Sequence, residues 1–214
     1  MKLKLIFILL LSCFYITSAF TQETAKQTYK SPNFEQQISS HKIVAILPLK
    51  VSISYRRMPK GFDAEGNKAD EIKQGTSMQQ GMYTYLLRKG DNYSVSFQDI
   101  DRTNALLKRA QVYEKIDEIL ADSLCNLLGV DAVIKCAYAY EKTGSEAGAI
   151  AKTLLFGVGG KTASGALTMQ IYEKKEGALV WRFYKEMNEG AFSNANELME
   201  RMMRKVSRNF PYEK

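Results

Sequence analysis

The chain has 214 residues, of which 45% are hydrophobic and 25% are charged, an ordinary balance for one packed globular domain. Its 30 basic and 23 acidic residues give a formal net charge of +7, but Lys and Arg are spread among Glu and Asp without a basic run, which argues against a nucleic-acid-binding protein. The single histidine leaves a zinc site almost without ligands, so we expect no metal and no other cofactor.

The first 19 residues have the pattern of a secretory signal peptide. Two lysines within residues 1–4 precede an unbroken apolar run over 5–11, and small residues gather before Ala19. The apolar run is shorter than a membrane span requires, so we expect export with cleavage near Ala19. The alternative is lipidation, because residues 10–13 (LLSC) resemble a lipoprotein lipobox in which Cys13 carries the lipid. We favour simple cleavage, since the residues after Cys13 are unusually apolar for a mature lipoprotein.

Residues 20–40 are polar and aperiodic, which predicts a flexible lead-in. The continuous apolar run Ile43–Leu47 is typical of a strand buried on both faces. Pro48 has no amide hydrogen and predicts a bulge or a sheet edge, after which strand alternation resumes up to Tyr55. Residues 56–70 are rich in polar residues and breakers and are predicted to form a loop.

The segment 70–89 carries its apolar residues at helical spacing, and Gly90 is expected to end that helix. Two glycines inside it, Gly75 and Gly81, each destabilise a helix by about 1 kcal/mol relative to alanine. We therefore expect another element to pack closely there. Alternation over residues 93–98 then predicts a half-buried strand.

Two more helices and a strand follow. Asp101 is placed to cap a short helix that runs through Ala110. The segment 116–128 has one apolar face and ends at Gly129, and the strand 131–140 begins at once. A helix that leads so directly into a strand is expected to pack back against it.

The two cysteines beyond residue 19, Cys125 and Cys136, lie in apolar register in that helix and that strand. An oxidising compartment would permit a disulfide between them. We expect instead that they fill the core as free thiols, because free cysteine is among the most buried residue types.

The C-terminal part predicts a β-hairpin and a last helix. Apolar and polar residues alternate over Leu167–Tyr172 and over Ala178–Tyr184, with a charged turn between them, so we expect these two strands to pair antiparallel. The helix over Asn194–Asn209 has acidic residues early and basic residues late, which suits its dipole. The predicted order is β-α-β-α-α-β-β-β-α. It indicates an α/β fold, a mixed-sheet sandwich, as a single domain over residues 41–212.

The insertion over residues 144–165 is both glycine-rich and apolar, and it joins two strands that should be neighbours in the sheet. Such neighbours usually need only two to five linking residues, so a passive linker does not explain its length. One interpretation is a short helix packed on the sheet, and the other is a contact with a membrane or a partner. We expect the contact. It would be made by the apolar side chains of Ile150, Leu154, Leu155, Phe156 and Val158.

Patterns that would indicate catalysis are incomplete. Residues 157–162 (GVGGKT) resemble part of a phosphate-binding loop, but Leu155 stands where that loop needs a glycine, and a strand follows where it needs a helix. His41 precedes a buried strand and no serine lies in a nucleophile elbow, which argues against a Ser-His-Asp site. We therefore expect no catalytic residue and no enzyme activity.

Four short segments in a common order resemble the superfamily of the curli-secretion lipoprotein, the lipoprotein activators of penicillin-binding proteins and the amino-terminal domain of the Tol–Pal translocation protein. They are Ile43–Pro48, the helix-to-strand passage Leu127–Ile134, the hairpin Met169–Trp181 and the terminal helix ending at Phe210–Tyr212. The resemblance extends over roughly residues 42–212.

The resemblance implies an exported, non-catalytic assembly or binding module in a Gram-negative envelope, in the periplasm or at the outer membrane. It implies an envelope protein as partner, whose identity it leaves open, and allows membrane contact and oligomers. An alternative is a subunit of an oligomeric secretion pore. Pore-forming members insert two amphipathic hairpins, whereas here only 144–165 is sufficiently apolar and 56–70 is polar. The second alternative, an envelope enzyme, has no supporting group of residues.

Overall fold

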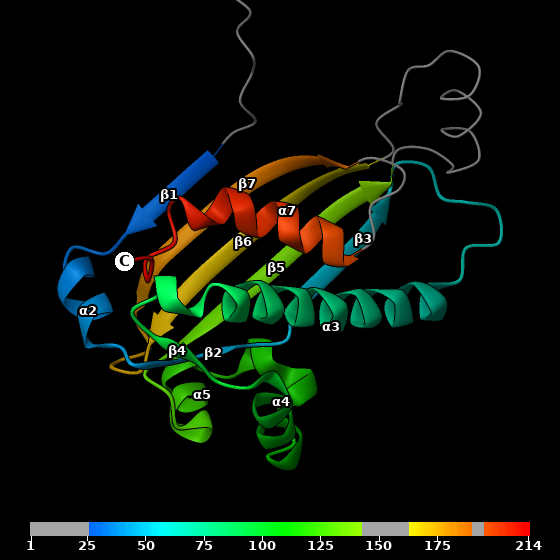
Figure 1. Ribbon diagram of the computed structural model, residues 1–214. Helices are drawn as coiled ribbons and strands as arrows, with labels where there is room; N and C mark the ends of the chain where they lie inside the picture. The colour runs from blue at the N-terminus through cyan, green and yellow to red at the C-terminus, as the bar shows by residue number, and fades with distance from the viewer. Residues whose placement is uncertain (1–25, 143–162, 190–194) are drawn as a thin grey trace, which may run out of the picture.

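The computed structural model describes residues 26–142, 163–189 and 195–214 (Figure 1). A seven-stranded mixed sheet runs through these residues, with helices against both of its faces. Its strands are β1 (Lys26–Lys30), β2 (Ile43–Ile46), β3 (Lys50–Tyr55), β4 (Ser96–Phe97), β5 (Ala132–Lys142), β6 (Ala163–Glu173) and β7 (Leu179–Glu189). The helices are α2 (Phe34–Ser40), α3 (Ala64–Arg88), α4 (Ile100–Arg109), α5 (Ala121–Leu128) and α7 (Ala195–Ser207), with the 3-10 helices η1 (Gly90–Asn92) and η2 (Tyr113–Glu118).

The predicted α/β fold with a mixed sheet is confirmed. The strands follow the order β1-β7-β6-β5-β2-β4, and β3 also pairs with β5. β2 and β3 run parallel to β5, whereas β5, β6, β7 and β1 are successively antiparallel. The predicted hairpin is β6–β7, in which Met169 lies opposite Phe183 and Ile171 opposite Trp181.

The strands β2 and β3 form one line along β5, interrupted at Pro48. Ile46 pairs with Ile134 and Lys50 with Ala137, so three residues of one strand lie opposite two of the other. This is the bulge that Pro48 predicts, because proline has no amide hydrogen for the ladder. The bulge allows the sheet to continue to Tyr55.

Two apolar cores lie on opposite faces of the sheet. The larger core packs α3 and α7 against the sheet, and Figure 1 shows these two helices side by side in front of it. The smaller core packs α4 and α5 against Ala45, Leu47 and Val133. Val44 and Ile46 point into the larger core, so β2 is buried on both faces as its apolar run predicts.

The expectation of a flexible lead-in over residues 20–40 is wrong from Lys26 onward. All five residues of β1 are exposed, so no apolar alternation marks a strand that is held by backbone pairing with β7. The helix α2 buries only Phe34 and Ile38, one helical turn apart. Two apolar residues in a polar segment were too weak a signal for a helix.

Three helix starts also differ from prediction. One is that of α5, which begins at Ala121 instead of residue 116, because residues 113–118 form the separate 3-10 helix η2. The helix α3 begins at Ala64 instead of residue 70, because Asp63 accepts a hydrogen bond from the Glu65 amide and caps it. Only residues 56–63 of the predicted loop are therefore irregular. The helix α4 is capped by Asp99 and not by Asp101, since the Asp99 carboxylate accepts from the Arg102 amide at 2.9 Å.

The close packing expected at a glycine of α3 is present at Gly75. A Cβ atom there would lie 2.3 Å from the carbonyl oxygen of Leu49, in the bulge between β2 and β3. Glycine thus lets α3 approach the sheet backbone. The predicted stop at Gly129 is confirmed as well, because that residue ends α5 in the left-handed conformation with φ of 68°.

An aromatic cluster closes one end of the sheet, near the start of β2, and we call it the closed end. Phe210 lies at its centre, buried, with its ring centroid 5.6 to 6.4 Å from four other rings. These four rings belong to Tyr93, Phe97, Trp181 and Tyr212. The Ser94 amide also donates to the Tyr212 carbonyl at 2.8 Å, which fixes the C-terminal tail against the chain before β4.

His41 belongs to the closed end. Its Nδ1 atom lies 2.8 Å from the Tyr212 hydroxyl, and the side chain is 5% exposed. Burial lowers the pKa of His41, and the nearby carboxylates of Glu173 and Asp131 oppose this shift in part. The residue that we considered for catalysis is therefore part of the packing.

Candidate functional site

The strands β3, β5 and β7 end, and β6 begins, in one row on the side of the sheet opposite the closed end. Tyr55 pairs with Lys142, Lys142 with Ala163, and Ala163 with Glu189. The predicted insertion over 144–165 extends too far, because residues 163–165 belong to β6 and pair with β5. The connection over residues 143–162 joins two strands of this row. We call the residues Tyr55–Phe62 together with Tyr140 and Lys142 the open end.

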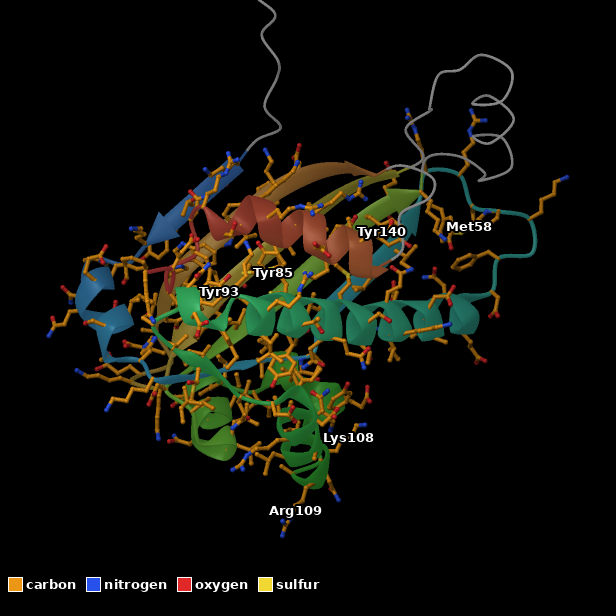
Figure 2. All side chains as sticks on the ribbon, viewed as in Figure 1. Met58, Tyr85, Tyr93, Lys108, Arg109 and Tyr140 are labelled. Carbon is orange, nitrogen blue, oxygen red and sulfur yellow. The ribbon has the colours of Figure 1, made fainter. Side chains whose placement is uncertain are left out.

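The β3–α3 loop exposes apolar side chains at the open end (Figure 2). Met58 is 64% exposed and Phe62 is 36% exposed. Figure 2 shows Met58 on the loop that projects beyond the strands, on the same side as Tyr140. Large exposed apolar side chains that gather in one place are a common mark of a contact surface.

The base of the loop is ordered by aromatic and polar contacts. The Tyr55 and Phe62 rings meet edge to face with centroids 5.5 Å apart, and the Lys142 ammonium lies 5.3 Å from the Tyr55 ring centroid. The Tyr55 hydroxyl donates to Asn67 Oδ1 at 3.1 Å, which connects β3 to the first turns of α3. Phe62 is thus held at a defined position although it is partly exposed.

Tyr140 anchors the neighbouring strand. Its hydroxyl accepts a hydrogen bond from Gln74 Nε2 at 3.1 Å, and its ring stacks on Tyr138 with centroids 5.6 Å apart. Burial raises the pKa of Tyr140, with the Gln74 hydrogen bond and Lys142 acting against this shift. The phenol therefore stays neutral and structural near pH 7.

The loop carries three basic side chains. Arg56, Arg57 and Lys60 are exposed and form no salt bridge within the part of the chain that the structure describes. No acidic residue occurs from Tyr55 to Phe62. The first one, Asp63, has its carboxylate directed to the Glu65 amide at 3.1 Å.

A second polar feature is a cavity of roughly 330 Å³ between η2, α3 and the bulge at Pro48. Asp117 lies beside it, with one carboxylate oxygen 2.6 Å from the Lys135 ammonium and the other 2.7 Å from that of Lys50. These two hydrogen bonds hold the pKa of Asp117 below its ordinary value. A carboxylate paired in this way is a poor proton acceptor, so the cluster ties η2 to the sheet.

The two cysteines are free and buried, as expected. Burial raises the pKa of Cys125 to about 12 and raises that of Cys136 as well. Neither thiol is therefore an activated nucleophile. Among the described residues, no three His, Cys, Asp or Glu side chains are placed to hold a metal ion.

The contact residues predicted from sequence and the lipidation candidate lie outside the described residues. They are Ile150, Leu154, Leu155, Phe156, Val158 and Cys13. Sequence reasoning missed the loop next to their insertion, because 56–70 was classed as polar. The signal was present in residues 56–62 (RRMPKGF), where two large apolar residues alternate with basic ones.

No helix in the described ranges is both long enough and apolar enough to cross a bilayer. No family model matches the chain, and no curated protein matches it.

Three solved structures are similar to the chain at low sequence identity. The PelC dodecamer from Paraburkholderia phytofirmans is 15% identical over 89% of this chain and 99% of that chain, with a TM-score of 0.43. Lipoprotein GNA1162 from Neisseria meningitidis is 11% identical over 78% and 94%, with a TM-score of 0.46. The LpoB C-terminal domain from Escherichia coli is 8% identical over 73% and 96%, with a TM-score of 0.34. These values do not assign the chain to a family, so the family resemblance stays a prediction.

Proposed function

We propose that the chain is a non-catalytic module of the bacterial envelope, in the periplasm or at the outer membrane, that binds an envelope protein. The contact is made at the open end of the sheet, with Phe156 and its apolar neighbours in the insertion as the main contact residues. The observation that carries this proposal is the difference between the two ends of the sheet. Aromatic packing closes one end, whereas apolar and basic side chains are exposed at the other.

The strand pairing next to the insertion supports a contact role. β5 and β6 are antiparallel neighbours that stay paired through Lys142 and Ala163, the last and first residues of the two strands. Strands in this arrangement can be joined by a tight turn of two to five residues. The connection instead spans residues 143–162. The fold does not require a connection of this length, which favours a function for residues 143–162.

The polar clusters of the described residues have structural partners, which favours binding over catalysis. Asp117 joins η2 to the sheet through two lysines, and His41 contacts Tyr212 inside the closed end. Asp131 accepts hydrogen bonds from the amides of Lys42 and Ile43 at 2.8 and 2.9 Å. Burial alone would raise the pKa of Asp131, but the two amides, together with the charges of His41 and Lys174, outweigh it and lower the pKa. Each group is thus committed to the fold.

Site-specific photo-crosslinking in living cells tests the proposal. A photoreactive amino acid is placed at position 156 of the full chain, and a matched chain carries it at Arg109, an exposed residue on α4 far from the open end (Figure 2). We expect one dominant crosslinked protein of the envelope fraction from position 156 and none from position 109. Equal crosslinking from both positions, or none from position 156, would contradict the proposal.

A further inference from the structure

We propose that the β3–α3 loop, residues 56–62, binds the surface of an anionic lipid bilayer. The proposal rests on the proposed function in one respect, because both place a contact at the open end. It adds a lipid membrane there as a second partner. The loop combines the two features that peripheral membrane contact needs, which are apolar side chains to enter the interface and basic ones to bind lipid headgroups.

The apolar part consists of Met58 and Phe62. Met58 is 64% exposed and is the more accessible of the two, while Phe62 is held against Tyr55 by its edge-to-face contact. The left-handed Gly61, with φ of 73°, turns the chain back toward the first turn of α3. The turn keeps the loop short and directs it beyond the strand ends, as Figure 2 shows for Met58.

The basic part surrounds these two side chains. Arg56 and Arg57 precede Met58, and Lys60 lies between Met58 and Phe62. All three are exposed and form no salt bridge within the described residues. Guanidinium and ammonium groups of this kind form strong hydrogen bonds with phosphate. The positive end of the α3 dipole follows at Ala64, although Asp63 offsets part of it.

Charge complementarity selects an anionic bilayer as the occupant. A basic residue near such a surface contributes about a fivefold gain in affinity, so three of them together contribute about 100-fold. A neutral bilayer would not provide this gain in affinity. Met58 and Phe62 can insert only two side chains into the bilayer interface. On their own they would give only weak and reversible binding.

Fluorescence quenching by brominated lipids tests the proposal on the full chain. The natural sequence has one tryptophan, Trp181, which is fully buried and reports little quenching. Met58→Trp places a second tryptophan in the loop. Leu87→Trp is the matched control, because Leu87 is 54% exposed near the other end of α3, a helix about 37 Å long. Both variants are mixed with brominated phosphatidylcholine vesicles, with and without phosphatidylglycerol.

We expect quenching of the Met58→Trp variant only on vesicles that contain phosphatidylglycerol, and no added quenching of Leu87→Trp. Raising the salt until the Debye length falls to about 3 Å should release the protein. Replacing Arg56, Arg57 and Lys60 by glutamine should weaken vesicle binding by about 100-fold, while Arg109→Gln on α4 should leave it unchanged.

Three results would overturn the proposal. The first is the absence of quenching at position 58 on anionic vesicles, and the second is quenching that is equal on neutral vesicles and unaffected by the triple glutamine variant. The third is a crosslink from position 58 to an acidic protein or glycan in cells without vesicle binding, which would assign the loop to that other partner. None of these results depends on crosslinking from position 156, so failure of this proposal is distinct from failure of the proposed function.

Discussion

The two ends of the sheet use aromatic residues in opposite ways. At the closed end, Phe210 is surrounded by four rings and is 4% exposed. At the open end, Phe62 contacts one ring among the described residues, that of Tyr55, and keeps 36% of its surface exposed. Phe210 thus stabilises the fold at the closed end, whereas Phe62 is partly accessible to a partner at the open end. The contrast holds for these two phenylalanines, although Ile43 at the start of β2 is 43% exposed and shows that apolar exposure also occurs near the closed end.

The largest expected effect is at the closed end. Phe210→Ala removes the ring at the centre of the aromatic cluster and leaves a cavity in a well-packed region. We expect the free energy of unfolding to fall by about 3–5 kcal/mol. Urea denaturation followed by Trp181 fluorescence measures it, because Trp181 contacts Phe210. A loss below about 1 kcal/mol would show that the C-terminal tail adds little to the fold.

A smaller effect is expected where α3 meets the sheet. Gly75→Ala places a Cβ atom 2.3 Å from the Leu49 carbonyl oxygen, and backbone atoms on both sides limit relaxation. We expect a loss of about 1–3 kcal/mol, although alanine is the better helix former. Gly66→Ala in the first turns of α3 tests a different contact, since a Cβ there meets the carboxylate of Asp63, which caps the helix, instead of a strand backbone. Stabilisation by Gly75→Ala would contradict the close approach.

The free energy of unfolding should also depend on pH, because His41 is buried in the closed end. Because burial lowers the pKa of His41, the unfolded chain takes up a proton near pH 6.5 while the folded protein still resists protonation. The unfolded state then binds more protons, so stability falls as the pH decreases from 7 through 6.5 toward the folded pKa. One group contributes about 1.4 kcal/mol for each unit by which its pKa differs between the two states.

His41 is the only histidine, which makes this dependence easy to isolate. Urea denaturation at several pH values between 7.5 and 5.5 measures the slope in the natural chain and in His41→Gln. The free energy of unfolding of His41→Gln should not change with pH over this range. A slope that persists in His41→Gln would assign it to other groups and contradict the role given to the buried imidazole.

The smallest effect is expected at the open end. Met58→Ser removes atoms that are mostly exposed, so the free energy of unfolding should change by less than about 0.5 kcal/mol. Phe62→Ala removes a ring that is 36% exposed and makes one edge-to-face contact, so a loss of about 1–2 kcal/mol is expected, still below that of Phe210→Ala. The same denaturation experiment provides the comparison with Phe210→Ala. A loss at Phe62 close to that at Phe210 would remove the distinction between the two ends.

The elements with a strong pattern were predictable from the sequence. The apolar run of β2, the bulge at Pro48, the glycine stop of α5 and the alternation of β6 and β7 each reflect a local rule. β1 was not predictable, because its five exposed residues carry no alternation and its pairing with β7 is set by a partner far along the chain.

The candidate site was only partly predictable, for a related reason. The predicted insertion at 144–165 is conspicuous in the sequence because apolar residues and glycines occur together between two predicted strands. The neighbouring loop is found only when the register of β3 and β5 brings Tyr55 beside Lys142, which sequence spacing does not reveal. Its two apolar residues were therefore interpreted as part of a polar connection.

The central claim is that the insertion makes a contact and does not belong to the core, and the thermal stability of Phe156→Asp tests it most directly. Phe183→Asp is the matched control, since Phe183 is 1% exposed in β7. Burying an unpaired charge there should lower stability by several kcal/mol, and the melting temperature by about 10 °C or more. We predict that Phe156→Asp melts within about 2 °C of the natural chain, a change of less than about 1 kcal/mol. A decrease comparable to that of Phe183→Asp would place Phe156 in the core and contradict the claim.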